Sequence, residues 1–147
     1  MIKLFLEDSK LQFDKFDILY HGTDLKSYEK IKNEGFSLKE GNKKTGLISH
    51  TNGISFTSLK NEAKEHADWA AEKFKNTPKI IAIDSKNLRI LSGDFYNSFD
   101  HKNAMTRAYA LYKKGKIDGV SFCDKETGDG CEEMEVVIFS LDKIKII

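Results

Sequence analysis

The sequence predicts an α+β domain, with helices in the first half and middle of the chain and strands at its ends. Two alanine-bearing segments have apolar residues at helical spacing, and several short β-branched runs bounded by turn residues are typical of strands. A chain of 147 residues with a single proline buries one hydrophobic core without linkers, so one domain spanning residues 1–147 is expected.

The composition excludes several classes of protein. Hydrophobic residues make up 39% and charged residues 32%, a balance typical of a soluble globular protein rather than a disordered or membrane-spanning one. The formal net charge is +1, so no global field favours nonspecific binding of nucleic acid. The lysines at 39–44 and 113–116 are expected to be solvated surface.

Cys123 and Cys131 flank a glycine-containing loop, but a disulfide framework normally uses more cysteines. Neither a secretory signal nor an apolar run of bilayer length is seen, so two free thiols in a reducing cytoplasm are expected. No metal site is expected, because His50 and His101 lack finger-like spacing to the cysteines. A monomer without membrane contact is predicted.

The first third of the chain should form a strand, a helix and a loop. Residues 18–20 predict a strand that enters a polar turn at residues 21–24. A helix should follow, because apolar residues recur every third position over 25–31 and Gly35 stands where a left-handed helix cap is expected. Residues 36–52 predict a long irregular loop.

The middle of the chain predicts a buried strand at 53–57 that leads into the clearest helix. Ser58 should supply the N-cap oxygen for a helix from about residue 59 to 75. Small residues that permit close packing define its core face, which consists of Ala63, Ala67, Ala70 and Phe74.

The second half should be mainly strands. Pro78 ends the helical segment, and residues 79–84 and 88–91 predict strands because they are short and β-branched. A second helix is predicted over 103–114, with Gly115 as its stop. Its inward face consists of Ala104, Ala108, Leu111 and Tyr112. Three further strands are predicted at residues 117–122, 135–139 and 143–147.

Three segments carry the residues of chemical interest. They are Leu19-Tyr20-His21-Gly22-Thr23, residues 53–58 (GISFTS), and the late apolar strand that Glu135 opens. In this order they resemble the ADP-ribosyltransferase superfamily, specifically its His-Tyr-Glu branch, which includes the poly(ADP-ribose) polymerases, and more closely its small phage-type members. That family also has an Asp-Gly-Val strand, and residues 117–120 (IDGV) stand in its place.

The resemblance covers roughly residues 19–147. It implies split antiparallel sheets with flanking helices and NAD as the substrate. Loss of nicotinamide leaves an oxocarbenium-like ribose, and Glu135 would accept a hydrogen bond from the ribose hydroxyl and stabilise that cation. By the same resemblance His21 would bond an adenine-ribose hydroxyl, the backbone of Gly22 would hold the carboxamide, and Thr23 would bond locally.

Glu133 lies two residues before Glu135, so a strand would put both carboxylates on one face. This Glu-x-Glu arrangement resembles the pair with which some members activate an arginine or another nucleophilic acceptor. The alternative, that Glu132 and Glu133 are solvated loop acids, stays open.

Ser55 departs from the family pattern, which has a nicotinamide-stacking tyrosine at that position. Phe56 should point to the opposite face, so His66 and Trp69, three residues apart on one helical stripe, are candidates for the aromatic wall. Trp69 is alternatively a half-buried core residue. Residues 56–58 (FTS) also resemble the Ser-Thr-Ser element of the toxin-like branch, whose hydroxyls brace the active site.

The sequence therefore predicts a cytoplasmic mono-ADP-ribosyltransferase that cleaves NAD at the nicotinamide glycosidic bond. The resemblance to phage-type members implies that a phage encodes it. Its acceptor is a protein, nucleic acid or small molecule, with a protein favoured over a nucleic acid. One alternative is an RNA 2′-phosphotransferase, because residues 19–35 also resemble the NAD-binding segment of that enzyme. A rifamycin-modifying transferase is a further relative. Another alternative is a noncatalytic binding or inhibitor protein with the same fold, in which Ser55 has replaced the tyrosine that stacks on nicotinamide.

Overall fold

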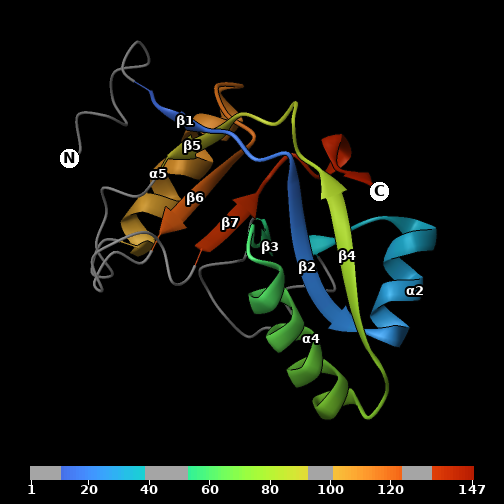
Figure 1. The fold of residues 1–147 in the computed structure, drawn as a ribbon. Coiled ribbons are helices and arrows are strands. Elements are labelled where there is room, and N and C mark those ends of the chain that lie inside the picture. Colours follow the sequence, from blue (N-terminus) through green and yellow to red (C-terminus); the bar gives the residue numbers. More distant parts are fainter. Residues whose placement is uncertain (1–10, 39–52, 93–100, 124–133) are drawn as a thin grey trace.

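The computed structural model describes residues 11–38, 53–92, 101–123 and 134–147. These residues form two β-sheets and three α-helices (Figure 1), so the predicted α+β class is confirmed. The strands are β1 (Phe13–Asp14), β2 (Ile18–Asp24), β3 (Ile54–Phe56), β4 (Pro78–Asp84), β5 (Ile90–Ser92), β6 (Gly119–Cys123), β7 (Met134–Ile138) and β8 (Lys145–Ile146). The helices are α2 (Leu25–Glu34), α4 (Lys60–Phe74), α5 (His101–Lys113) and the short 3₁₀ helix Leu141–Lys143.

The sheets have the strand orders β1-β5-β6-β7-β3 and β2-β4-β8. The three-stranded sheet is antiparallel, but β5 and β6 of the five-stranded sheet run parallel, which differs from the expected antiparallel sheets. A parallel pair needs a crossover connection, and α5 lies in this connection and packs against β6.

Within the part of the chain that the structure describes, a backbone bridge joins the two sheets. Tyr20 of β2 and Thr57, which directly follows β3, exchange two hydrogen bonds of 2.8 and 2.9 Å. Figure 1 accordingly shows β3 between β7 and β2. After Tyr20, β2 continues to pair with β4 and separates from β3. We call the region between residues 21–24 of β2 and the strand β3 the sheet split.

Two hydrophobic cores lie on opposite faces of the five-stranded sheet. Adjacent residues of β7 alternate between them, as the period of a strand requires. The core under α5 includes Leu91, Met105, Ala108, Leu111, Val120 and Val137. The core on the other face includes Leu19, Phe56, Ile81, Ile83, Ile90 and Val136.

Strand β2 extends through the segment predicted to be a turn. Residues 21–24 continue to pair with β4 as far as Asp24, which lies opposite Pro78. This pairing satisfies backbone groups that a turn would leave without partners. Asp24 then caps α2 by accepting a hydrogen bond of 3.4 Å from the backbone N–H of Ser27. His21, Gly22 and Thr23 are therefore held in a strand.

The start of α4 also differs from the prediction, because Ser58 is not its N-cap. Leu59 occupies the cap position without a side-chain cap bond. The hydroxyl of Thr57 accepts a hydrogen bond of 3.1 Å from the N–H of Leu59 and donates one of 3.0 Å to the carboxylate of Glu62. These contacts fix the direction in which the chain leaves β3.

Other predicted helix features are confirmed in part. Gly35 and Gly115 end α2 and α5 with positive φ angles of 81° and 75°, which favour glycine. The small residues of the α4 core face are buried, at Ala63, Ala67 and Ala70. Phe74 lies on the same face but in the last turn of α4 and is 39% exposed, so its expected burial in the core was wrong.

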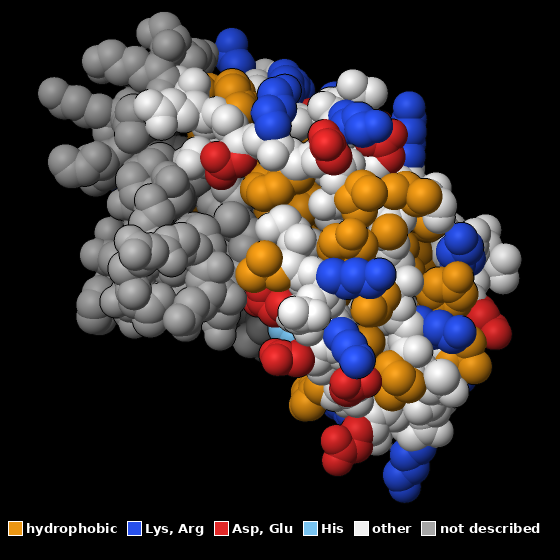
Figure 2. Space-filling view, viewed as in Figure 1, with side chains coloured by type: hydrophobic (Ala, Val, Ile, Leu, Met, Phe, Trp, Pro, Cys, Tyr) orange, Lys and Arg blue, Asp and Glu red, His pale blue; other side chains and the backbone are white. Residues whose placement is uncertain are grey.

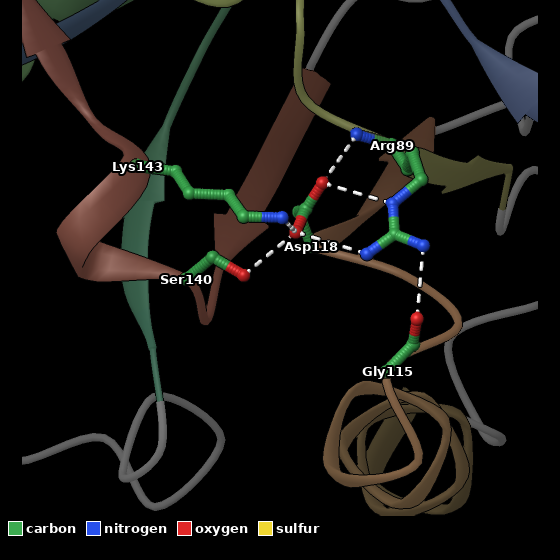
Figure 3. A network of polar contacts seen from close by, with 5 residues as sticks. All are labelled: Arg89, Gly115, Asp118, Ser140 and Lys143. Carbon is green, nitrogen blue, oxygen red and sulfur yellow. Dashed lines mark hydrogen bonds and ion pairs between the residues drawn. The ribbon is translucent and has the colours of Figure 1, made fainter.

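A buried carboxylate joins the ends of several strands (Figure 3). Asp118 accepts hydrogen bonds from the side chains of Arg89, Ser140 and Lys143 at 2.8 to 3.4 Å. Arg89 also donates to the backbone oxygen of Gly115 at 2.9 Å. Burial alone would raise the pKa of Asp118, but these donors overcome it and hold the pKa well below its ordinary value. We interpret this network as structural, because it ties β6 to the segments before β5 and after β7.

Figure 2 shows basic and acidic side chains interspersed over the face drawn, without a large patch of one sign. This distribution agrees with the nearly balanced charge of the sequence. Of the helices in the described ranges, none combines the length and apolarity needed to cross a bilayer.

Candidate functional site

Residues from three strands meet at Ser55. The imidazole Nδ1 of His21 lies 2.8 Å from the backbone oxygen of Ser55, and the Ser55 hydroxyl donates a 3.0 Å hydrogen bond to Oε2 of Glu135. These partners are 34 and 80 positions from Ser55 in the chain. All three side chains are half-buried. We call His21, Ser55 and Glu135 the Ser55 cluster.

Strand pairing explains why Glu135 reaches Ser55. Strand β3 runs antiparallel to β7, with Ser55 opposite Val137. Glu135 lies two residues from Val137 and so shares its face of the sheet, within diagonal reach of Ser55. On the other side, the bridge between Tyr20 and Thr57 brings His21 of β2 beside β3.

The environment of His21 specifies its protonation. A carbonyl oxygen only accepts hydrogen bonds, so Nδ1 carries the proton and Nε2 of the neutral ring is an acceptor. Burial lowers the pKa of His21 below its ordinary value of 6.5, against the raising effect of the Ser55 carbonyl, and the charge of His66 lowers it further. At pH 7 the imidazole is therefore neutral.

Two phenylalanines hold the imidazole in place. Ring centroids of Phe36 and Phe56 lie 5.4 and 5.5 Å from that of His21, and Phe36 meets it edge-on. Phe56 is only 2% exposed, so its ring supports His21 and offers little surface to a ligand. The sequence interpretation missed Phe36, although an apolar residue just after a glycine helix cap often packs back on the fold.

Gly22 must be glycine for a reason that the sequence did not reveal. A Cβ atom there would lie 1.9 Å from the backbone oxygen of Ala63 and 2.7 Å from the nitrogen of Ala67, so α4 lies directly on β2. The N–H and C=O of Tyr20 face Thr57, and alternation directs those of Gly22 to the same side, into the sheet split. The backbone of Gly22 therefore faces β3.

Thr23 is 7% exposed, and its hydroxyl lies 3.5 Å from the carboxylate of Asp24. This is a local contact at the start of α2. The buried position gives Thr23 little surface for a ligand.

His66 and Trp69 are both exposed on α4, where residues three apart are neighbours on one face of the helix. His66 is exposed and lines an open hollow of about 640 Å³ at the N-terminal end of the helix, together with residues 58–62 and Glu65. Trp69 is two residues beyond Ala67, which faces β2, so it lies on the far side of the helix. It is 60% exposed, with Lys73 Nζ 5.0 Å from its ring centroid. The structure therefore brings Trp69 neither to the Ser55 cluster nor into the core.

Several sequence expectations fall outside the described residues. They concern positions 39–52 of the predicted loop, which include His50, and also Cys131, Glu132 and Glu133. Within the described ranges, no three His, Cys, Asp or Glu side chains gather as a metal ion would require.

The Ser55 cluster connects the first and last of the three sequence segments through the second one. It combines an imidazole acceptor, a hydroxyl and a carboxylate at the place where two sheets part. No family model matches the chain, and no curated protein matches it in sequence.

Proposed function

We propose that the chain is a mono-ADP-ribosyltransferase, which breaks the nicotinamide glycosidic bond of NAD and transfers ADP-ribose to an acceptor. A protein acceptor is favoured over a nucleic acid. The observation that carries the proposal is the Ser55 cluster. A single residue contacts both the His21 imidazole and the Glu135 carboxylate, which come from segments far apart in the chain.

Glu135 has the chemistry that this reaction needs. Departure of nicotinamide leaves positive charge on the ribose, and a fixed carboxylate stabilises that charge more in the transition state than in the ground state. The Ser55 hydroxyl holds Oε2 of Glu135 at 3.0 Å and so limits rotation of the carboxylate. A carboxylate that is already oriented loses less free energy to reorganisation during the reaction.

His21 would act in binding. Its neutral ring presents Nε2 as a hydrogen-bond acceptor, which suits a ribose hydroxyl. His21 packs against the Phe56 ring, whereas Glu135 accepts a hydrogen bond from the Ser55 hydroxyl. The side chains of Ser55 and Phe56 alternate to opposite faces of β3. A dinucleotide that touches both His21 and Glu135 would therefore run along the sheet split, past the backbone of Gly22.

The test is incubation of the full chain with NAD and a cell lysate, with nicotinamide release measured by chromatography and modified products by mass spectrometry. Glu135→Gln removes the charge with little change of shape and should slow nicotinamide release by about 10² to 10³-fold. Glu72→Gln, an exposed change on α4, serves as the control and should leave the rate unchanged.

Different outcomes separate the alternatives. Binding of NAD without release of nicotinamide would favour a noncatalytic binding protein on this scaffold. Absence of NAD binding would contradict both proposals. An effect of Glu135→Gln below about tenfold would remove Glu135 from the catalytic role, since preorganised charged groups contribute more than that.

A further inference from the structure

We infer that the outer face of α4 at Glu65, Asp68 and Trp69 is a docking surface for an arginine-bearing segment of a partner protein. We call these three residues the Trp69 surface. The inference goes beyond the proposed function and does not depend on it, because Trp69 lies on the side of α4 away from β2.

Helical spacing gathers the three side chains. Asp68 and Trp69 follow Glu65 by three and four positions in α4, so both are its neighbours on the helix surface. Side chains of a helix lean towards its N-terminus, which directs the Trp69 ring over the turn that carries Glu65. A carboxylate therefore lies beside the indole ring.

The Trp69 surface is exposed and its charges are unpaired. All three side chains face solvent, and Trp69 is 60% exposed. Within the described ranges, neither the Glu65 nor the Asp68 carboxylate takes part in an ion pair or a hydrogen bond. Neighbouring like charges on a helix repel each other, and a large apolar ring in water is unfavourable. A partner that supplies positive charge and an apolar contact would relieve both.

The position of Lys73 shows which cation fits. Its Nζ atom lies 5.0 Å from the ring centroid of Trp69, at the distance of a cation–π contact. A lysine from a partner would only exchange one ammonium for another. A guanidinium is planar and more weakly hydrated, it stacks on an aromatic face, and its N–H donors match the carboxylate of Glu65. The surface should therefore prefer arginine to lysine.

The charges along α4 fix where the guanidinium binds. At the N-terminal end, free N–H groups give the first turn a partial positive charge, and Lys60 adds a full one. The effect of the helix dipole fades within one turn, so the cation should lie farther along, beside Glu65 and Trp69. Glu65 also lines the open hollow of about 640 Å³, which leaves room for adjoining residues of the segment.

The same charges argue against a nucleic acid. An exposed aromatic ring beside a lysine would suit the stacking of a base. The carboxylates of Glu65 and Asp68 would, however, repel the phosphates on either side of that base. Charge complementarity therefore favours a basic protein segment.

The experiment measures binding of a synthetic peptide in which arginine alternates with serine and both ends are blocked. Trp69 is the one tryptophan of the chain, so its fluorescence reports binding at this surface. We expect the arginine peptide to change the fluorescence and to bind about threefold or more tightly than a matched lysine peptide. A matched glutamate peptide should not bind, and added salt should weaken the arginine complex.

Variants separate the ring from the charges, with Kd measured by calorimetry. Trp69→Leu should raise the Kd of the arginine peptide about 2- to 30-fold, the range for a cation–π contact, and Trp69→Phe should lose less. The double variant Glu65→Gln/Asp68→Asn should raise it about 2- to 30-fold, as expected for two exposed ion pairs. Thermal unfolding should show little change, because all these side chains are exposed.

The matched control is Glu29→Gln/Glu34→Gln, which removes the same charge from exposed positions of α2. This helix packs on the other face of the three-stranded sheet from α4. The control should change the Kd less than about 1.5-fold, since exposed charges at that distance are screened by salt. Equal weakening by both double variants would overturn the inference, because net charge alone would explain it.

Other outcomes would also refute the Trp69 surface. They are absence of arginine-peptide binding, an unchanged Kd in Trp69→Leu, and tighter binding of a single-stranded oligonucleotide than of the peptide. Sedimentation of the chain alone tests a second copy as the occupant. Self-association that Trp69→Leu abolishes would assign the surface to that copy and overturn the proposal of a basic partner.

Discussion

The hydroxyl of Ser55 donates a 3.0 Å hydrogen bond to the carboxylate of Glu135, which lies 80 positions away in the chain. A bond to a charged acceptor is stronger than a neutral one and orients that acceptor. The backbone oxygen of the same residue holds the imidazole of His21 at 2.8 Å. Ser55 is thus the residue that links the other two.

Removal of the Ser55 hydroxyl should reduce catalysis more than binding. Hydrogen bonds to charged groups contribute roughly 1.5–3 kcal/mol, so Ser55→Ala should lower kcat for nicotinamide release about 10- to 100-fold, with little change in KM. Ser55→Thr keeps a hydroxyl and should recover most of the rate. Ser58→Ala, outside the cluster, is the control, and a fully active Ser55→Ala protein would show that Glu135 needs no such orientation.

Stability should fall in mild acid because of His21. Its pKa is lower in the folded chain than the ordinary 6.5, so the unfolded chain binds the proton more readily. The free energy of unfolding should therefore decrease as the pH falls below about 6.5, by at most about 1.4 kcal/mol per pH unit. Urea unfolding between pH 7.5 and 5 measures this slope, which His21→Gln should flatten. An identical slope in the variant would assign the acid sensitivity to other groups.

A methyl group at Gly22 should force α4 away from β2. The new Cβ would lie 1.9 Å from the backbone oxygen of Ala63, so Gly22→Ala should cost about 1–3 kcal/mol or more of unfolding free energy. The clash involves backbone, so a second change, Ala63→Gly, should not relieve it. Thermal unfolding of the single and double variants checks both statements, and rescue in the double variant would contradict the geometry.

Asp118→Asn should destabilise the fold. The change leaves the donors of Arg89 and Lys143 with a weaker acceptor, so the free energy of unfolding should fall by roughly 2–3 kcal/mol. The loss is smaller than for a fully buried ion pair because both cations are partly exposed. The folded pKa is depressed, so the carboxylate stabilises at pH values above the ordinary 3.8 and loses its effect as the pH falls further.

Chemical denaturation at pH 7 and pH 3 measures the contribution of Asp118. The difference in unfolding free energy between the wild type and Asp118→Asn should be smaller at pH 3 than at pH 7. Asp142→Asn, an exposed change in the neighbouring 3₁₀ helix, should stay within about 0.5 kcal/mol of the wild type at pH 7.

Individual positions show how far sequence patterns reached into the candidate site. His21 and Glu135 were identified from their segments, and the structure brings both to one residue. The alanine face of α4 implies that Trp69, two residues beyond Ala67, lies on the opposite side of the helix, and its exposed fraction of 60% agrees with this. Phe36 follows the predicted glycine cap of α2, but its contact with His21 depends on the neighbouring strand β2 and could not be predicted from the local segment alone.

The sequence by itself determined the α+β class, the alanine face of α4 and the glycine ends of α2 and α5. These features depend on residue spacing within one turn or strand, or on a backbone angle that glycine adopts easily. Only the tertiary structure decided that β2 runs on to Asp24, that β5 and β6 are parallel, and that Ser55 meets both His21 and Glu135. The physical reason is that strand pairing and register join residues far apart in the chain, and local periodicity does not specify the partner.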